Sequence, residues 1–269
     1  MTIIRNDDYF EPGNNLLSGS KIKDYIKDKE FFYKKHIAGE IETPITDALI
    51  IGSAVDCWLS EGRKIFDEKY IVFGKGTKRN KAHPDFKHHL TETIYNQIVA
   101  MCTKAEKQPA FHDLADYEKQ IILKAKMNLG VHFKYLSGIP DWFKVDGDTC
   151  IIVDLKTAQS ASNFKYHYHC LEFGYYFQQA VYQYLLKKLN PGIEKFVSKH
   201  WVIEKDRDDI YNSYTFNLSQ ARIDKEKEKL EIILDDIKKE KDFTPRVTSW
   251  EDAESIGLLE EEMDAEMDL

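Results

Sequence analysis

The sequence predicts a mixed α/β (α+β) fold in which a central mixed sheet, containing an antiparallel meander, is flanked by helices. Two pairs of strand-like segments are each joined by a short turn of Asn, Asp and Gly residues, which indicates two successive hairpins near the middle of the chain. Segments with helical periodicity precede and follow them. The chain has 269 residues, of which 42% are hydrophobic, so it can bury a substantial core.

The N-terminal part is expected to be mainly helical. Ser18 or Ser20 can cap a helix that continues to about His36. A second helix is expected from residue 46 or 47 to residue 61, and its small residues 52–54 would let another element approach closely.

A strand, a basic loop and a long helix are expected next. Residues 65–73 alternate like a strand, and residues 74–81 form a glycine-flanked loop rich in Lys and Arg. A helix is then expected from about residue 85 to residue 107.

Four segments are expected to form the meander. Each hairpin turn contains Gly together with Asn or Asp, residues that accept a positive φ. The segments are residues 117–126 with 131–136, and residues 141–145 with 149–155.

The C-terminal part is expected to complete the sheet and cover it. Helical segments span residues 161–189, further strands are expected at 196–204 and 211–217, and an amphipathic helix follows at 219–241. Because no internal repeat or low-complexity linker interrupts this pattern, we expect one domain.

The expected domain covers residues 1–250, with a helical part at about 15–115 and a catalytic core at about 116–240. Residues 251–269 form an acidic tail with nine Asp or Glu and no Lys or Arg. The net charge of −8 comes mostly from this tail, since the remainder carries 38 basic and 37 acidic side chains. The tail is expected to be solvated and flexible, and it could also compete for a basic groove or dock a partner.

The composition argues against several classes of protein. The chain begins without a basic segment followed by an apolar one, and its longest nearly apolar stretch, residues 48–55, is too short to span a bilayer, so we expect a cytoplasmic protein with no membrane partner. The four cysteines form no Cys-x-x-Cys pair. His167 and His169 lie in an aromatic segment, and a helix would not place both on one face, so the histidines are not expected to bind metal.

The motif that points to chemistry is Asp141 followed by the triplet from Asp154 to Lys156. Asp154 ends an apolar run, where an unpaired carboxylate would be costly to bury, so a metal ion or a lysine is the natural counter-charge. Two carboxylates can hold a hard divalent cation, and a lysine two residues after the second shares its face of the strand, where it can orient a water. This pattern predicts metal-dependent hydrolysis of phosphodiester bonds, whereas the simpler interpretation is an ion pair without a catalytic role.

Three other residues are candidates for the same site. Glu118, near the start of the first hairpin, could add a metal ligand or could be an exposed strand carboxylate. Gln178 and Tyr182 lie one helical turn apart and share a face. The triplet from Asp236 to Lys238 has the same letters as the motif, but it lies in a helical pattern and is expected to be a solvated surface.

Taken in order along the chain, these motifs resemble the PD-(D/E)xK nuclease superfamily, and most closely its exodeoxyribonuclease VIII and RecB-like branch of bacteriophage and bacterial recombination. The resemblance covers roughly residues 15–250 and implies a restriction-endonuclease-like core. The matching segments are residues 17–21, 51–55, 78–81, Glu118, 138–141, 153–157, and Gln178 with Tyr182.

The resemblance implies that Asp141, Asp154 and the main-chain carbonyl of Leu155 bind Mg²⁺, with Mn²⁺ as a substitute, while Lys156 positions the attacking water. Gln178 and Tyr182 would support Lys156 or contact the DNA backbone. The expected phosphate contacts are Ser20, Lys21, Lys78, Arg79 and Lys81.

The chain departs from the branch in three places. Asp56 stands where relatives often have histidine, and Asp154 where many have glutamate. The cysteines that hold an iron–sulfur cluster in some relatives are absent.

The first hypothesis is therefore a Mg²⁺-dependent 5′-3′ exonuclease that degrades linear double-stranded DNA from its ends, in a bacterial host cytoplasm if a phage encodes it. A single-strand annealing protein as partner and a homo-oligomeric ring around DNA are implied by the resemblance. A structure-specific or nicking endonuclease on the same core is the second hypothesis. The third is a DNA-binding protein that retains the fold without catalysis.

Overall fold

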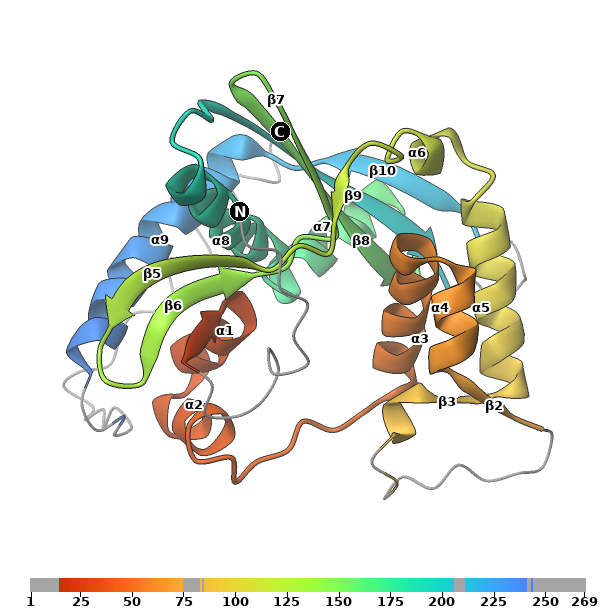
Figure 1. Cartoon of the computed structure of the whole chain (residues 1–269), viewed down its shortest axis with the longest axis horizontal. Coiled ribbons are helices and arrows are strands. Elements are labelled where there is room, and N and C mark those ends of the chain that lie inside the picture. The colour runs from red at the N-terminus through yellow and green to blue at the C-terminus, as the bar shows by residue number, and fades with distance from the viewer. Residues whose placement is uncertain (1–14, 75–82, 84, 206–210, 241–242, 244–269) are drawn as a thin grey trace.

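Figure 1 shows the computed structural model, which describes residues 15–74, 83, 85–205, 211–240 and 243. The predicted basic loop and the acidic tail lie outside the described residues, apart from Gly74 of the loop. No helix in the described part of the chain is long and apolar enough to cross a bilayer.

A five-stranded sheet forms the centre of the molecule, in the order β10-β9-β8-β7-β4. Strands β8 and β9 are parallel and the other pairs are antiparallel, so the predicted mixed sheet is confirmed. The strands are β4 (Glu118–Lys119), β7 (Trp142–Asp146), β8 (Thr149–Ala158), β9 (Lys195–Glu204) and β10 (Ser213–Asn217).

A second sheet has three strands, with β1 (Leu16–Ser18) parallel to β6 (Phe133–Gly138) and β5 (Leu123–Leu129) antiparallel to β6. The prediction of one continuous meander is therefore wrong, because its two hairpins belong to different sheets. Gln120, with a φ of 51°, ends β4 before β5 begins. Pro140, which has no N–H to donate, lies between β6 and β7. The first hairpin, β5 with β6, therefore leaves the main sheet at this level, while β7 and β8 remain in it.

The first predicted helix is divided in two. Ser18 caps α1 (Gly19–Lys27), and Asp28 ends it with an extended φ of −164°. The Asp28 carboxylate then accepts a hydrogen bond from the N–H of Phe31 and so caps α2 (Lys29–His36).

The second predicted helix is confirmed. Thr46 caps α3 (Asp47–Asp56), and a π-helical turn, η2 (Cys57–Glu61), continues it. A Cβ atom on Gly52 would lie 3.6 Å from Thr157 Oγ1, so this small residue lets α3 pack directly against β8.

The strand predicted over residues 65–73 is wrong for most of its length. Residues up to 69 form the helix α4 (Arg63–Lys69), because Phe66 packs on Trp58 and ion pairs one turn apart line the outer face. A short pair of parallel strands, β2 (Ile71–Phe73) and β3 (His89–Thr91), follows, with the 3₁₀ turn η3 (Phe86–His88) before β3. The expected long helix is consequently shorter, as α5 (Glu92–Ala105), and α6 (Pro109–His112) comes after it.

Three further helices complete the fold. The predicted segment 161–189 consists of α7 (Asn163–Glu172) and α8 (Tyr175–Leu189), separated by Gly174 with a φ of 61°. The last predicted helix is α9 (Gln220–Lys239).

The core has two main parts, and the site lies between them. One hydrophobic cluster joins the smaller sheet to α1, α2, α8 and α9, and the other joins the main sheet to α3, α4 and α5. In Figure 1 these are the left and right sides of the molecule, and β7 and β8 run between them.

Candidate active site

Asp141 and Asp154 come together where the two sheets diverge. Trp142 pairs with Val153 in the antiparallel ladder of β7 and β8, and the next position along it places Asp141 opposite Asp154. Side chains at opposed positions project from the same face of a sheet. The Asp154 side chain is 1% exposed, and Asp141 is partly buried.

The main chain of β8 holds Asp141 in place. Its Oδ2 accepts a hydrogen bond of 2.7 Å from the N–H of Leu155, and its Oδ1 lies 3.4 Å from Nε2 of Gln120. Leu155 is therefore part of the site through its backbone, one residue after Asp154.

Asp56, at the C-terminal end of α3, supplies a third carboxylate. Gln120 Nε2 donates to both of its oxygens, at 2.9 and 3.0 Å. Burial and the nearby Asp154 raise the pKa of Asp56 to about 7. Burial, Asp154 and Asp56 raise the pKa of Asp141 well above its usual range. The three acids are thus close enough to oppose one another's ionisation.

Lys156 lies beside the carboxylates and is held from three directions. It forms an ion pair with Asp154, donates to Gln178 Oε1 at 3.1 Å, and places Nζ 4.6 Å from the centroid of the Tyr175 ring. Burial opposes its charge, but Asp154 and Asp141 outweigh that effect and raise the pKa of Lys156 above its usual value. Its side chain is 14% exposed, so water can reach it.

Gln178 and Tyr182 form a relay that fixes Lys156. The Gln178 amide donates to the Tyr182 hydroxyl at 2.8 Å, and this hydroxyl donates to the carbonyl of Ile139 at 2.9 Å. Gln178 therefore contacts Lys156 directly, and Tyr182, one turn later on α8, contacts Gln178.

His200 lies behind Asp154. The two residues are partners in the parallel ladder of β8 and β9, and His200 is fully buried. Its Nδ1 shares a hydrogen bond of 2.7 Å with the hydroxyl of Tyr166. Burial lowers the pKa of His200 to about 3, so it stays neutral and supports the site without adding charge.

The residues present suit a hard divalent cation. Asp154 pairs with Lys156, the charge of Asp141 acts on both, and Asp154 Oδ2 receives no hydrogen bond from the described residues beyond its ion pair. Within the described ranges no three His, Cys, Asp or Glu side chains form a complete metal cage. Mg²⁺ commonly takes one or two carboxylates and keeps several waters, so Asp141 and Asp154 fit such an ion without a third ligand.

A hollow of about 670 Å³ opens from Asp141 towards α1 and α2. Its wall on the site side includes Gln120, Gln178 and Tyr182, and its opposite wall carries Lys23 and Lys35. Asp24 lies on the same wall as the two lysines and pairs with Lys35 at 2.8 Å, and Asp141 is the acid of the site that lines the hollow. A cleft with Asp141 at one side and Lys23 at the other can accept the charged backbone of a nucleic acid.

The predicted phosphate contacts have different environments. Ser20 is exposed at this hollow, where its hydroxyl meets that of Ser18 at 2.9 Å. Lys21 is buried, donates to the carbonyl of Leu16 at 2.9 Å, and has a pKa lowered to about 8 by burial. Its ammonium group therefore supports the N-terminal strand and is not exposed for a phosphate contact. Lys78, Arg79 and Lys81 lie outside the described residues.

Glu118 is not brought to the site. Its side chain is exposed on β4, and it pairs in register with Phe143. Gln120, two residues later, approaches Asp141 in its place, because its positive φ turns the chain into the cleft.

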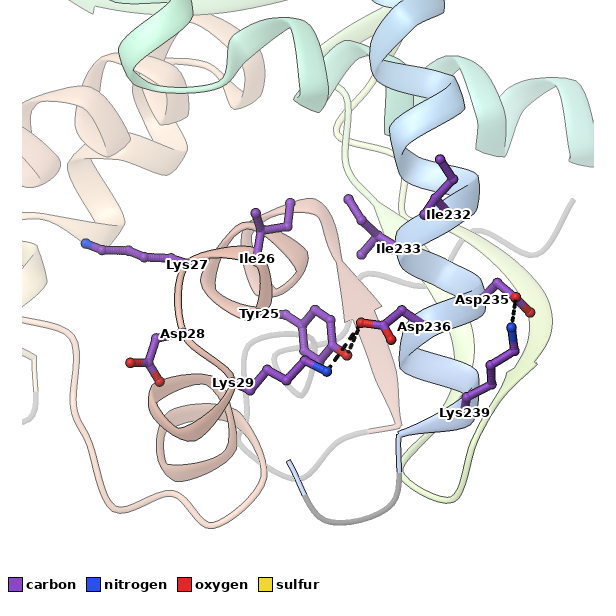
Figure 2. A pocket seen from close by; sticks show the side chains of 10 residues that line it. All are labelled: Tyr25, Ile26, Lys27, Asp28, Lys29, Ile232, Ile233, Asp235, Asp236 and Lys239. Atoms are coloured by element: carbon purple, nitrogen blue, oxygen red, sulfur yellow. Dashed lines mark hydrogen bonds and ion pairs between the residues drawn. The ribbon is translucent and has the colours of Figure 1, made fainter. Parts of the chain in front are cut away.

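A second hollow, of about 680 Å³, lies between α1, the start of α2 and α9 (Figure 2). Tyr25 and Lys29 point towards Asp236 across it, and none of the three carboxylates of the site lines it. The Asp236 to Lys238 triplet lies in a helix, as expected, but only Lys238 is on an exposed surface, because Asp236 contacts Tyr25 and Lys29 and Ile237 is buried.

Sequence reasoning did not identify Gln120, Tyr175 and His200. Gln120 has no motif around it, and its role depends on a positive φ that tertiary contacts impose. Tyr175 carried a signal, since it lies in the aromatic segment that includes His167 and His169. Asp56 stands where nucleases of the resembling branch often have histidine, and the structure places it near Asp141 and Asp154.

The chain is similar to known proteins in two of three comparisons. A family described as a PDDEXK-like domain of unknown function (DUF3799) matches residues 18–254. The crystal structure of a protein from Eubacterium rectale, provisionally described as an exonuclease, covers 96% of this chain and 98% of its own, with 17% identity and a TM-score of 0.63. The two proteins therefore share a fold.

A second solved structure, that of SSO0001, covers 80% of this chain and 82% of its own at 13% identity. Its TM-score of 0.27 is too low to carry an argument. No curated protein sequence matches the chain.

Proposed function

Because this chain belongs to the PDDEXK-like family DUF3799, we propose that it is a Mg²⁺-dependent deoxyribonuclease that hydrolyses linear double-stranded DNA from its ends. The observation that carries the proposal is the arrangement of Asp141 opposite Asp154 with Lys156 beside them. A simple ion pair between Asp154 and Lys156 would need neither Asp141 nor Asp56 beside it.

Each residue of the site has a separate role in this proposal. Asp141, Asp154 and the carbonyl of Leu155 would hold the cation, which supplies Lewis-acid activation of a phosphate and of a water when bound. Lys156 orients the attacking water, and Gln178 and Tyr182 fix the lysine through the relay that ends at Ile139. Asp56 and Gln120 set the charge and position of Asp141.

Digestion from ends is the finer part of the proposal. The description of the Eubacterium rectale protein as an exonuclease supports it, although at 17% identity the shared property is the fold. The 5′-3′ direction, a ring-shaped homo-oligomer and a single-strand annealing partner in recombination complete this hypothesis. We infer phosphate contacts from the lysines around the hollow, so DNA binding is expected to weaken steeply with salt.

The test is digestion of one linear duplex labelled separately at each end, beside a closed circle, with Mg²⁺ or EDTA. We expect Mg²⁺-dependent release of mononucleotides from the 5′ end and an intact circle. Relaxation or linearisation of the circle would favour the endonuclease hypothesis on the same core. Release from the 3′ end would reverse the proposed direction.

Variants locate the chemistry. Asp154→Asn and Lys156→Ala should each abolish cleavage while leaving the fold and most DNA binding intact. Lys238→Ala is the matched control, because Lys238 stands in the same triplet pattern but is exposed on α9. Digestion at the wild-type rate by either site variant would show that the active site is assigned wrongly.

The non-catalytic hypothesis predicts a different result. Calorimetry with Mn²⁺ should show specific uptake by the wild type and its loss in Asp141→Ala. If neither protein takes up the ion, a DNA-binding protein without catalysis becomes the better explanation.

A further inference from the structure

Gln179 of α8 is a polar side chain enclosed within the protein. It is fully buried, and neither its Oε1 nor its Nε2 has a hydrogen-bond partner among the described residues. Gln183, one turn later and equally buried, differs, because its Nε2 donates to Ser198 Oγ and Gln220 Oε1, both at 3.0 Å. Burying an amide without hydrogen bonds is costly, so folded proteins pair nearly all such groups with protein atoms or with ordered water. Gln179 therefore indicates a partner that the described part of the chain does not supply.

Helical spacing places Gln179 over the main sheet. Tyr175, Gln179 and Gln183 follow one another at intervals of one turn, so they lie along one face of α8. The Tyr175 ring lies 5.4 Å from the His200 ring, and Gln183 bonds to Ser198. His200 and Ser198 are two residues apart on β9 and therefore project from the same face of the strand. Because Gln179 lies between these two contacts, its amide faces β9 at the level of His200.

His200 is the second polar side chain at this place that the protein leaves without a partner. Its Nδ1 shares a hydrogen bond with the Tyr166 hydroxyl, but its buried Nε2 has no partner among the described residues. His200 is the ladder partner of Asp154 on the adjacent parallel strand, so both side chains project from the same face of the sheet. The unpartnered Nε2 and the Gln179 amide therefore lie in the layer between the sheet and α8, next to Asp154.

The chemistry of the two groups identifies their partner as water. A neutral imidazole has one donor and one acceptor nitrogen, and an amide offers an acceptor oxygen beside a donor nitrogen. A cation cannot pair with the amide Nε2 of Gln179, and an anion would be repelled by the adjacent Asp154. Water both donates and accepts, and a buried water typically makes about three hydrogen bonds to polar groups of this kind. Gln179, His200 and Asp154 together provide such a set.

We propose that ordered water bridges Gln179 and His200 and donates a hydrogen bond to the Asp154 carboxylate, so that both residues position this metal ligand. The proposal rests on the proposed function and deepens it by adding two positioning residues to the site. Lys156 holds Asp154 through the ion pair, and the bridge holds it from the side of β9 and α8. Residues that orient a metal ligand in this way typically change metal affinity by about 10- to 100-fold when they are replaced.

The bridge is tested first without metal, by thermal unfolding of Gln179→Met in EDTA. Methionine has nearly the length of glutamine but no amide. If the amide had no partner, its removal would end an unfavourable burial and raise the Tm. If water bridges it to His200, its removal breaks a buried hydrogen-bond network, and we expect the Tm to fall by about 2–4 °C. An unchanged or higher Tm would overturn the proposal.

The positioning of Asp154 is tested by calorimetry with Mn²⁺, a readout that a purely structural role does not change. We expect Gln179→Met to bind Mn²⁺ at least about 10-fold more weakly than the wild type. Gln183→Met is the matched control, because Gln183 is equally buried on the next turn but bonds to Ser198 and Gln220. It should lower the Tm and leave the Mn²⁺ affinity unchanged. Equal loss of affinity in both variants would overturn the positioning role.

Two variants of His200 test the other end of the bridge. His200→Gln keeps a polar group that can reach the water, whereas His200→Leu does not. We expect His200→Leu to lose Mn²⁺ affinity as Gln179→Met does, and His200→Gln to retain most of it. Equal affinities of the two variants would show that His200 does not act through a hydrogen bond.

A failure of this proposal can be distinguished from a failure of the proposed function. If the wild type takes up Mn²⁺ and digests DNA while Gln179→Met binds the ion equally well, the nuclease proposal stands and the positioning role is wrong. If the wild type takes up no Mn²⁺, the proposed function and the positioning role both fail, and the Tm in EDTA still decides whether the bridge exists.

Discussion

The side-chain amide of Gln120 donates to both carboxylate oxygens of Asp56, at 2.9 and 3.0 Å, and reaches within 3.4 Å of Asp141 Oδ1. Gln120 adopts a φ of 51°, which is strained for a residue with a side chain. The main sheet and α3 are thus connected at the site by one residue that tertiary structure holds in an unfavourable conformation.

Gln120→Leu should weaken the site without removing a carboxylate. A hydrogen bond donated to a carboxylate stabilises its charged form, so its loss raises the pKa of Asp56 and of Asp141 further. Protons then compete with the cation at higher pH. We expect the acid limb of the pH–rate profile to move up by about one pH unit, and Mn²⁺ affinity by calorimetry to fall in parallel.

Glu118→Gln is the control for this change, because Glu118 lies on β4 but is exposed. Its pH–rate profile and Mn²⁺ affinity should match the wild type. If Glu118→Gln abolished cleavage while Gln120→Leu did not, a conformation with Glu118 at the metal would have to replace the arrangement described above.

Asp56→Asn should stabilise the metal-free protein in a pH-dependent way. The pKa of Asp56 is raised to about 7 in the folded state from an ordinary 3.8, first by burial and then by Asp154. The folded state therefore favours the protonated form, and the stability associated with it is fully present below about pH 3.8 and is lost progressively as the pH rises from there through about 7. The gain in stability from Asp56→Asn should therefore be larger at pH 8 than at pH 5, by at least about 1 kcal/mol, or about 2–4 °C in Tm.

Thermal unfolding in EDTA at both pH values measures this difference. Asp146→Asn, at an exposed hairpin position, should show no pH-dependent gain. Equal stabilisation by Asp56→Asn at pH 5 and pH 8 would mean that Asp56 does not carry a buried charge at pH 8.

The sequence could predict the meeting of Asp141 and Asp154 because local signals determine it. Gly147, with a φ of 60°, closes the hairpin between β7 and β8, and the register that follows puts the two acids opposite each other. The ion pair from Asp154 to Lys156 then depends only on strand alternation. Gln178 and Tyr182 were placed by helical spacing in the same way.

The remaining differences depend on contacts that are distant in sequence. Residues 65–69 alternate like a strand, but Phe66 finds its partner in Trp58 only if they form a helix. The expected meander divides because Gln120 takes a positive φ that no residue type near it demands. A propensity pattern cannot show either effect, since tertiary packing decides both.

Gly138→Ala should disturb the relay behind Lys156. A Cβ atom there would lie 3.0 Å from two ring atoms of Tyr182 and 3.2 Å from Leu185 Cδ1. The ring must move, which costs about 1–3 kcal/mol and disrupts the hydrogen bond from Tyr182 to Ile139. We expect a lower Tm and, because Lys156 is misplaced through Gln178, a rate of cleavage about 10- to 100-fold lower.

Gly74→Ala is the matched change, because among the described residues, chain neighbours aside, no atom lies within 4 Å of the added Cβ. It should alter neither the Tm nor the rate. Retention of full activity by Gly138→Ala would show that the position of Tyr182 does not govern Lys156.

Tyr25→Phe should destabilise the protein without affecting cleavage. The Tyr25 hydroxyl donates to Asp236 at 2.7 Å across the hollow of Figure 2, and Lys29 pairs with Asp236 at 3.4 Å. Loss of the hydroxyl leaves this partly buried carboxylate with one donor fewer, so we expect a loss of about 1–2 kcal/mol in the free energy of unfolding by denaturant. Lys239→Ala, which removes an exposed pair with Asp235, should leave the free energy of unfolding almost unchanged. The cleavage rate is measured at a temperature well below the Tm of the variant. A contact between α1 and α9 that only supports the fold cannot change the rate of a folded enzyme greatly. If Tyr25→Phe lowered the rate as strongly as Lys156→Ala, this hollow would have to be part of the catalytic apparatus.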